Sequence, residues 1–486
     1  MTEEEIQRLR EENAELKAAL AQKEQRIQEL EELLRGALLR IEEWEKRLVK
    51  DSHNSSLPPS RDHGTRKPLG QRPKSQKPSG GQPGHRGHAL QAVEQPDEVI
   101  VHRPERCQHC QHELGEQAGQ VVERRQVHDV PTVRLRVQEH QVETVSCPHC
   151  QQQTRGSFPV GVNAPVQYGP GVRGLAVYLS QYQLLPLQRT GELLEDLLEA
   201  PVSQGAVREW VEDAARKLSP TMEHISELLL RAPVMHVDET SVHVQGKVQW
   251  IHEHGTRHLT LYRWHGKRGA EGIEAVSLVP RYQGRMMHDR WTSYDRYSCT
   301  HSLCGAHLIR DTIFVAEQEK QPWAVRMVEH LRHMDHVSNQ WREQGARQLP
   351  ASVRQALLAE YFEILRIGYA AHANQPLPPP PKRGGHQKQN PSLNLLDAFL
   401  KRAEQVLGFL DDLSIPFTNN LAERDLRMIK VQQKISGTFR SPEGVSTFCT
   451  IRSYLSTMHK QGRPLLAALR AVFAGSPFSI ASQAGT

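Results

Sequence analysis

The 486-residue chain carries 61 Lys and Arg residues against 56 Asp and Glu residues, which gives a formal net charge of +5. This small excess excludes nucleic-acid binding through overall charge alone, so local basic patches would have to hold such a partner. No apolar run approaches the roughly 18 residues of a membrane span, and the first residues lack the features of a signal peptide. We therefore expect a cytoplasmic protein of about two to four domains, with no membrane partner.

Residues 1–50 carry a heptad pattern in which only Asn13 and Lys23 interrupt the apolar a and d positions. The pattern predicts a coiled coil that joins two or more copies of the chain, and an Asn at an a position favours a parallel homodimer. The alternative is a single surface helix. The apolar seam consists of Ile6, Leu9, Leu16, Leu20, Ile27, Leu30, Leu34, Ala37, Ile41, Trp44 and Leu48.

Residues 51–95 are rich in Pro, Gly, Ser, Lys and Arg and offer almost nothing to bury. This composition predicts a basic, flexible arm. The arm either lies along a phosphate backbone or serves as a solvated linker.

Residues 96–160 contain two Cys-x-x-Cys pairs, Cys107 with Cys110 and Cys147 with Cys150, separated by a stretch of strand-like alternation. Four thiolates in this spacing suit a tetrahedral zinc site that joins two hairpins. We therefore expect a zinc ribbon with one Zn²⁺. Its role would be structural, because four protein ligands leave no open position on the metal.

Residues 161–232 have the pattern of a helical domain. Within it, residues 193–217 read as a helix, a short turn and a second helix. That form is compatible with a helix-turn-helix DNA-binding domain, and a plain helical bundle is the alternative.

A two-residue periodicity after Pro233 predicts three consecutive antiparallel strands within 234–265. A helix, a fourth strand at 284–289 and a short fifth strand at 300–305 follow. This is the opening order of the ribonuclease-H-like α/β fold. We expect such a core over 233–440, with a helical insertion at about 320–408 and a C-terminal helical segment over 441–486. The whole chain would then be a multidomain α+β protein.

Two acids fall on the strands that this fold brings together. Asp238 lies in the first strand and Asp289 ends the fourth. Their carboxylates would be adjacent and could hold the same pair of divalent ions, which prefer oxygen ligands. Taken singly, each acid is better explained as a turn or cap residue, and it is their occurrence together on these strands that indicates a metal site.

A third acid, Glu423, lies on a later helix among basic residues that suit DNA phosphates. The three acids together form a candidate two-metal nuclease site for two Mg²⁺ or Mn²⁺ ions. A local alternative exists for Glu423, since Asn420 and Glu423 also fit a capping box. The basic residues are Arg424, Arg427, Lys430 and Lys434.

Several motifs occur together in this chain: the coiled coil, the arm sequence SGGQPGHRGH, the paired Cys-x-x-Cys, YGPGVRGLAVYLSQYQLLPLQRTGELL, HVDET and NNLAERDLR. Together they resemble the transposases of the insertion-sequence-66 family over nearly the whole chain. The resemblance implies an Asp-Asp-Glu triad on a ribonuclease-H-like core, and it places the triad at Asp238, Asp289 and Glu423. It also implies an enzyme that cuts the ends of an element and joins them to target DNA.

Two positions depart from the family pattern. Trp291 stands where the family usually has Tyr, and Asp425 stands where a small residue is usual, which makes Asp425 a rival to Glu423. On a helix, Asp425 would point about 200° away from Glu423. Cys304-Gly-Ala-His307 resembles the Cys-x-x-His found after the second acid in many transposases. His307 is therefore a candidate to support the metal ligands, with ordinary packing as the alternative.

The sequence thus predicts a Mg²⁺-dependent DNA transposase, nucleoid-associated and at least dimeric, whose partners are element ends and target DNA. Accessory proteins of the same element are further candidate partners. One alternative is a stand-alone ribonuclease-H-like nuclease or resolvase. The other is a zinc-containing dimeric DNA-binding regulator without catalysis.

Overall fold

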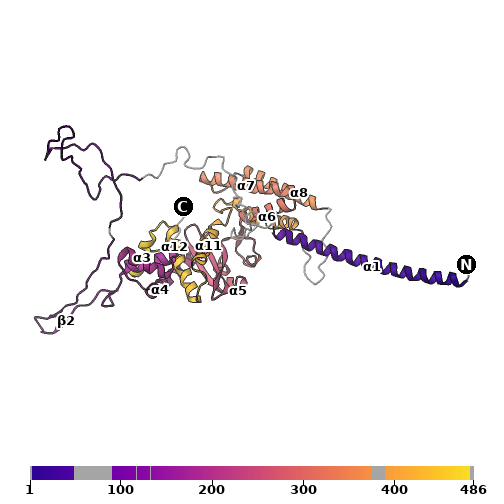
Figure 1. Ribbon diagram of the computed structural model, residues 1–486, viewed down its shortest axis with the longest axis horizontal. Coiled ribbons are helices and arrows are strands. Elements are labelled where there is room, and N and C mark those ends of the chain that lie inside the picture. Colours follow the sequence, from indigo (N-terminus) through magenta and orange to yellow (C-terminus); the bar gives the residue numbers. More distant parts are fainter. Residues whose placement is uncertain (1–2, 49–89, 117, 132, 374–388, 482–486) are drawn as a thin grey trace. The chain divides into compact units, whose positions relative to one another are not determined.

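The structure, a computed structural model, describes residues 3–48, 90–116, 118–131, 133–373 and 389–481 (Figure 1). The chain divides into two compact units. Unit 1 contains Met1–Gln71, Ala164–Thr190 and Gln204–Thr486, and unit 2 contains Arg72–Asn163 and Gly191–Ser203. None of the described helices combines the length and the apolar character that a membrane crossing requires. The predicted arm falls mostly outside the described residues.

The N-terminal helix α1 (Glu3–Leu48) runs through the heptad segment without a break (Figure 1). The large seam residues whose side chains are described are all more than half exposed. Apolar area is more favourable out of water, so a row of this kind favours association with another apolar surface. The helix thus presents the seam that a coiled coil requires. The exposed seam residues are Leu16, Leu20, Ile27, Leu30, Leu34 and Ile41.

The two Cys-x-x-Cys pairs of unit 2 fold into turns of the same shape. The Cys107 N–H donates to the His112 carbonyl at 2.9 Å, and the Cys147 N–H donates to the Gln152 carbonyl at 2.8 Å. A bridge between Arg106 and Glu113 flanks the first turn. The antiparallel strands β1 (Thr144–Ser146) and β2 (Gln153–Arg155) flank the second.

The strand-like alternation between these turns does not produce strands in the described residues of 98–143. Val122 and Val127, for example, are more than nine-tenths exposed. An alternating segment becomes a stable strand only when it pairs with neighbours and buries one face. That part of the expectation was wrong, because this segment buries no apolar face.

Among the described residues of unit 1, five strands form one sheet in the order β5-β4-β3-β6-β7. Strands β3 (Val234–Val244), β4 (Lys247–Gly255) and β5 (Thr260–His265) follow one another in the chain, and each runs antiparallel to the next. Strands β6 (Arg285–His288) and β7 (Thr300–Leu303) run parallel to β3. A strand is therefore present at each of the five expected positions.

The turns of this sheet differ in how closely they follow the sequence pattern. Gln245 and Gly246 both have positive φ, 50° and 75°, as a two-residue hairpin turn requires. The sequence pattern predicts the second turn at His254 and Gly255, but the turn falls later in the structure. β4 continues through Gly255, and the Thr256 N–H then donates to the Leu259 carbonyl at 2.9 Å.

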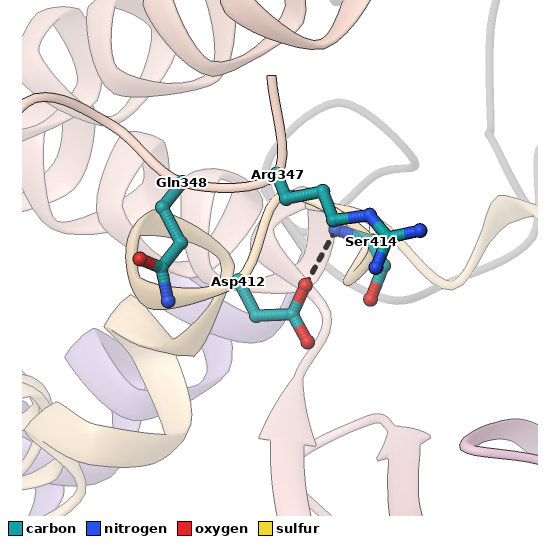
Figure 2. Close-up of a pocket in the computed structure, with 4 residues that line it drawn as sticks. All are labelled: Arg347, Gln348, Asp412 and Ser414. Carbon is teal, nitrogen blue, oxygen red and sulfur yellow. Dashed lines mark hydrogen bonds between the residues drawn. The ribbon is translucent and has the colours of Figure 1, made fainter. Parts of the chain in front are cut away.

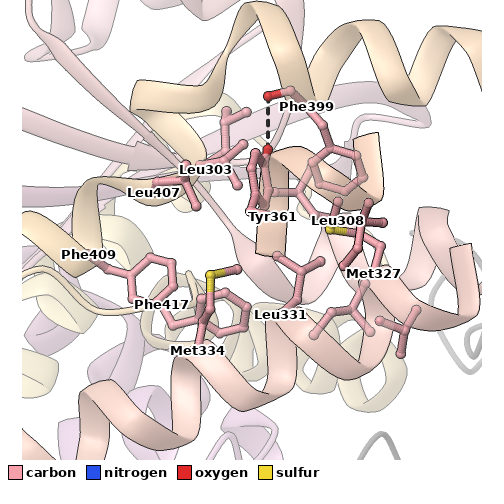
Figure 3. Close-up of a cluster of buried hydrophobic side chains, with 14 of the residues drawn as sticks. Leu303, Leu308, Met327, Leu331, Met334, Tyr361, Phe399, Leu407, Phe409 and Phe417 are labelled. Atoms are coloured by element: carbon pink, nitrogen blue, oxygen red, sulfur yellow. Dashed lines mark hydrogen bonds between the residues drawn. The ribbon is translucent and has the colours of Figure 1, made fainter. Parts of the chain in front are cut away.

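One apolar cluster packs the helices of the insertion around β6 and β7 (Figure 3). It contains Met287 and Leu303 from the sheet and large side chains such as Tyr361, whose hydroxyl donates to the Phe399 carbonyl at 2.9 Å. The helices concerned are α6 (Gly305–Gln318), α7 (Pro322–Glu343), α8 (Ala351–His372), α9 (Pro391–Lys401) and α10 (Ala403–Asp411). Residues 374–388, which belong to a Pro-rich stretch of the sequence between α8 and α9, are outside the described residues.

A second cluster packs α11 (Asn420–Ser436) and α12 (Pro442–Lys460) against β3, β4 and β5. Its members include Val242, Ile251 and Tyr262 from the strands and Ile429 from α11. The short helix α5 (Ala270–Val276) connects β5 to β6. The sheet is thus held between helices from the insertion and helices that follow it, and this arrangement positions α11 beside β3.

The remaining helices precede and follow the core. They are α2 (Pro170–Val177), which continues into a π-helix over Tyr178–Tyr182, then α3 (Leu187–Leu198), α4 (Gln204–Leu230) and the C-terminal α13 (Leu465–Phe473). α13 packs on α2, and α4 packs on α12. The structure therefore has a helix, a short connection and a helix where a helix-turn-helix was considered, and its use in DNA binding stays a prediction.

Candidate active site

Asp238 and Asp289 are set side by side by the register of two parallel strands. β3 pairs with β6 so that Val234 lies opposite Arg285 and His236 opposite Met287. The same offset continues to the residue pair Asp238 and Asp289, just beyond the last paired residues. The local sequence explains why both carboxylates occur there, since each follows a short apolar run that is buried in the sheet.

The electrostatics of Asp238 reflect this arrangement. Burial raises the pKa of its carboxyl group well above the usual range, and the negative charges of Glu239 and Asp289 raise it further. A hydrogen bond from the Glu239 N–H, 2.8 Å long, and the nearby His307 act in the opposite direction. Two carboxylates that repel each other in a partly buried position favour a proton or a cation between them.

Glu423 lies in the first turn of α11, close to His307 and Arg310 of α6. Its Oε1 is 3.8 Å from His307 Nδ1 and 4.0 Å from Arg310 Nη1, and it is buried without a hydrogen-bond partner. The residue before the helix is Asn419, not Asn420, and it makes no side-chain capping bond. Glu423 is therefore one position too far along the helix for the capping box considered from the sequence.

His307 connects Glu423 to the strand acids. Burial lowers the pKa of its imidazole, but Cys304 and then Glu423 counteract this, and the pKa is raised to about 9. The His307 charge also acts on Asp238. The side chains of Cys304, His307 and Glu423 offer ligand atoms that all lie within 4.8 Å of one another. That group includes neither Asp238 nor Asp289, so the three predicted acids do not form one ligand shell in the described structure, although His307 acts on both Glu423 and Asp238.

A hydrogen-bond network beside the acids was not foreseen from the sequence. Glu239 is almost fully buried, and it accepts hydrogen bonds from Arg268 Nε at 2.7 Å and from the Tyr294 hydroxyl at 2.7 Å. The Arg268 guanidinium lies between the rings of Trp250 and Trp291, 5.0 and 4.2 Å from their centroids. Trp291, the departure from the family pattern, thus helps to fix the cation that balances Glu239.

A second acid missed by the sequence reasoning is Glu253, which lies opposite Asp238 on β4. It is fully buried, and burial raises the pKa of its carboxyl group well above the usual range. A neutral carboxyl group is therefore favoured at this position. The only signal in the sequence was a Glu within an otherwise strand-like run, which did not distinguish it from a solvated residue.

Asp425, the rival third acid, points away from this group. Its Oδ2 is 2.5 Å from Lys460 Nζ on α12 and accepts a hydrogen bond from the Thr260 hydroxyl at 3.1 Å. Asp425 is thus bound by an ion pair that ties α11 to α12 and β5. Glu423 keeps a carboxylate oxygen without a hydrogen-bond partner, whereas Asp425 Oδ2 already has two partners.

A family model described as Transposase IS66 family matches residues 165–447, more than half of the chain. The chain belongs to this transposase family. The resemblance drawn from the sequence motifs is thereby confirmed. A second model, described as Family of unknown function (DUF6444), matches residues 2–91. No curated protein matches the chain.

The match of this IS66-family transposase includes all three predicted acids and the basic residues of α11. Arg424, Arg427 and Lys434 are exposed. Lys430 is held against β3, where its Nζ donates to the Ser241 carbonyl at 2.6 Å, and burial lowers its pKa. All four predicted DNA contacts are therefore exposed residues, and Lys430 is in addition hydrogen-bonded to the sheet.

The predicted zinc cysteines lie outside both family matches. Backbone hydrogen bonds from Cys110 and His109 lower the pKa of Cys107, and the equivalent bonds lower that of Cys147. These bonds favour the thiolate, which is the form that binds zinc. Among the described residues, no group of three or more candidate ligands contains any of these cysteines. Each pair forms its turn, and the joining of both turns around one ion stays a prediction.

An open hollow of about 700 Å³ lies elsewhere in unit 1, lined by Arg347, Gln348, Asp412 and Ser414 (Figure 2). Asp412 Oδ1 accepts a hydrogen bond from the Ser414 N–H at 2.8 Å, which fixes this loop after α10. The lining contains none of the predicted acids. The hollow therefore does not contribute to the candidate active site.

Proposed function

We propose that this IS66-family transposase cleaves DNA at the ends of an insertion sequence and joins them to target DNA by two-metal phosphodiester chemistry. Asp238, Asp289 and Glu423 would hold two Mg²⁺ or Mn²⁺ ions. The observation that supports this proposal is the pairing register of β3 and β6, because the same offset brings Asp238, within β3, opposite Asp289, which directly follows β6.

The donor atoms fit such ions. All three side chains are carboxylates, the ligands that hard divalent cations prefer. A cation would relieve the repulsion that raises the pKa of Asp238. It would also satisfy the buried Glu423 Oε1, which has no hydrogen-bond partner. When bound, the two ions would activate a water or a 3′-hydroxyl group and stabilise the leaving oxygen.

The surrounding residues keep the acids in place and separate their roles. Arg268 and Tyr294 hold the Glu239 carboxylate on the strand, so the acid next to Asp238 is engaged elsewhere. Lys460 does the same for Asp425 on the helix. The strand order, with three antiparallel strands followed by two parallel ones, supports our proposal that the core is ribonuclease-H-like.

Other parts of the chain would bring the DNA to this site. The exposed Arg424, Arg427 and Lys434 lie on the same helix as Glu423 and suit phosphate contacts. We also propose that α1 forms a coiled coil between two copies of the chain, and that the four knuckle cysteines bind one structural Zn²⁺. A dimer would allow two element ends to be held together.

The direct test is to incubate the purified full-length chain with its own flanking DNA and Mg²⁺ and to map the cut and joined ends. We expect cuts at the element ends and joined products. Asp238→Asn should reduce the rate at least about a hundredfold, because even changes behind a metal ligand cost about 10–100-fold. The control is Asp213→Asn, which alters a surface pair with Arg216 on α4.

The outcomes separate the alternatives. Cuts that ignore the end sequence would indicate a stand-alone nuclease, and specific binding without any cut would indicate a regulator. Either result contradicts the proposal, as would equal cutting by the wild type and Asp238→Asn.

A further inference from the structure

A cluster of three chemically different ligands lies where α6 and α11 begin. Cys304 is the residue before α6, His307 lies in its first turn, and Glu423 lies in the first turn of α11. Their sulfur, ring nitrogen and carboxylate oxygen are all within 4.8 Å of one another. The N-terminal ends of α6 and α11 therefore bring three possible metal ligands close together.

The cluster is only partly satisfied by the protein itself. His307 Nδ1 and Glu423 Oε1 are both buried without a hydrogen-bond partner, although they are 3.8 Å apart. Leaving buried polar atoms unpaired costs free energy, and two such atoms that face each other across 3.8 Å leave a position that a bound ion would satisfy. The Arg310 guanidinium also lies beside this carboxylate, 4.0 Å from Glu423 Oε1, and it would have to turn aside.

A hydrogen bond from the backbone holds the Cys304 sulfur in place. The Asn419 N–H donates to Cys304 Sγ at 3.1 Å, and the Asn419 side chain bonds to His236 Nδ1 at 2.7 Å and to the Val237 carbonyl at 2.9 Å. Asn419 is 1% exposed. The thiol is therefore anchored through one rigid residue to β3, the strand that carries Asp238. Hydrogen bonds of this kind behind a ligand orient it for metal binding.

A sulfur, an imidazole nitrogen and a carboxylate oxygen suit Zn²⁺ and do not suit Mg²⁺, which prefers oxygen ligands alone. We propose that Cys304, His307 and Glu423 form a binding site for Zn²⁺, and that Zn²⁺ bound there withdraws Glu423 from the Mg²⁺ site and inhibits DNA cleavage. Binding releases the proton of the Cys304 thiol and one proton of the His307 imidazolium, because both side chains bind metal in their deprotonated forms. The inhibitory part rests on the proposed function, whereas the binding part does not.

Binding is tested on the full-length chain without DNA, with Co²⁺ as a visible stand-in for Zn²⁺. Thiolate-bound Co²⁺ absorbs strongly, so titration counts the thiolate-bound ions. We expect the wild type to bind one more such ion per chain than Cys304→Ser. Cys449→Ser, which changes a buried thiol on α12, should match the wild type.

A second variant keeps the test decisive if Cys304→Ser folds poorly. Glu423→Gln retains the thiol and the imidazole but removes a charged ligand, and it should weaken Co²⁺ binding at this site by at least about tenfold. Equal numbers of thiolate-bound ions in the wild type and in Cys304→Ser, with both proteins folded, would overturn the proposal.

Inhibition is tested by adding Zn²⁺ to a Mg²⁺-dependent cleavage assay, with each variant compared to its own rate without zinc. Half-inhibition of Cys304→Ser should need at least about tenfold more Zn²⁺ than that of the wild type. Equal inhibition of both would overturn the regulatory role. If Co²⁺ binds through Cys304 but the wild type cuts no DNA with Mg²⁺, the binding site stands, and the proposed function and its inhibition by zinc both fail.

Discussion

Two carboxylates stand two residues apart on α11, and their surroundings give them different tasks. Glu423 Oε1 is buried beside His307 without a hydrogen-bond partner. Asp425 is bound to Lys460, whose Nζ also donates to the Thr256 and Leu259 carbonyls. We interpret Glu423 as a ligand and Asp425 as a structural residue.

Asp425→Asn should therefore destabilise the fold. The substitution keeps the shape but leaves the Lys460 ammonium largely buried without its counter-ion, and breaking a buried pair in this way costs about 3–5 kcal/mol. Urea denaturation measures the loss. Glu363→Gln alters the exposed pair with Arg366 and should cost less than about 1 kcal/mol. A change at Asp425 no larger than that of this control would show that the pair contributes little.

The site was predictable at the residues that carry a motif, and not at those that depend on the folded chain. Asp238, Asp289 and Glu423 stand in recognisable strand and helix contexts. The pair of Glu239 with Arg268 joins residues 29 positions apart, and their contact exists only after β4, β5 and the following loop have folded. No spacing rule in the sequence connects them.

At the level of single elements, α1 is the clearest example of agreement between pattern and structure. Its helix covers the whole heptad segment. The strand-like segment before Cys147 shows the opposite case, because alternation alone does not supply a partner strand. Helices satisfy their backbone hydrogen bonds internally, whereas strands depend on distant residues, and this explains the difference.

We expect Ile27→Lys combined with Leu34→Lys to convert the dimer to a monomer while unit 1 stays folded. Both side chains lie in the exposed seam of α1, and charges at a positions oppose helix pairing. Light scattering measures the mass. Glu32→Lys, at an outer position of the heptad, serves as the control and should remain dimeric. A wild type that is already monomeric would refute the coiled coil.

The second element-scale prediction concerns the knuckle at Cys107. Cys110→Ser should lose one zinc ion per chain and loosen unit 2, because a structural zinc site contributes directly to folding. Metal analysis of the purified protein and limited proteolysis of unit 2 are the measurements. Unchanged zinc content in Cys110→Ser would contradict the ribbon.

For the whole molecule, the core contains histidines that must stay neutral. Burial lowers the pKa of His252 to about 4 and that of His254 to about 3, from an ordinary value of 6.5. The unfolded chain therefore binds more protons below pH 6.5. The stability that these groups contribute is fully present above pH 6.5. It is lost as the pH falls toward 4 for His252 and toward 3 for His254, at up to about 1.4 kcal/mol per pH unit for each.

His254→Gln should consequently flatten the fall in stability between pH 6.5 and pH 5. The measurement is the urea midpoint as a function of pH, compared with the wild type. His243→Gln, which changes an exposed residue of β3, should keep the wild-type slope. Parallel curves for the wild type and His254→Gln would contradict the assignment.

The measurement that tests the central claim most directly is the rate of Mg²⁺-dependent cleavage of element-end DNA by Glu423→Gln, set against Asp425→Asn under conditions where both are folded. Gln retains the size of Glu but removes the charge that holds Mg²⁺, so cleavage should fall at least about a hundredfold while binding in a gel shift persists. Asp425→Asn should cut at a rate close to that of the wild type. Normal cutting by Glu423→Gln, with none by Asp425→Asn, would contradict the account.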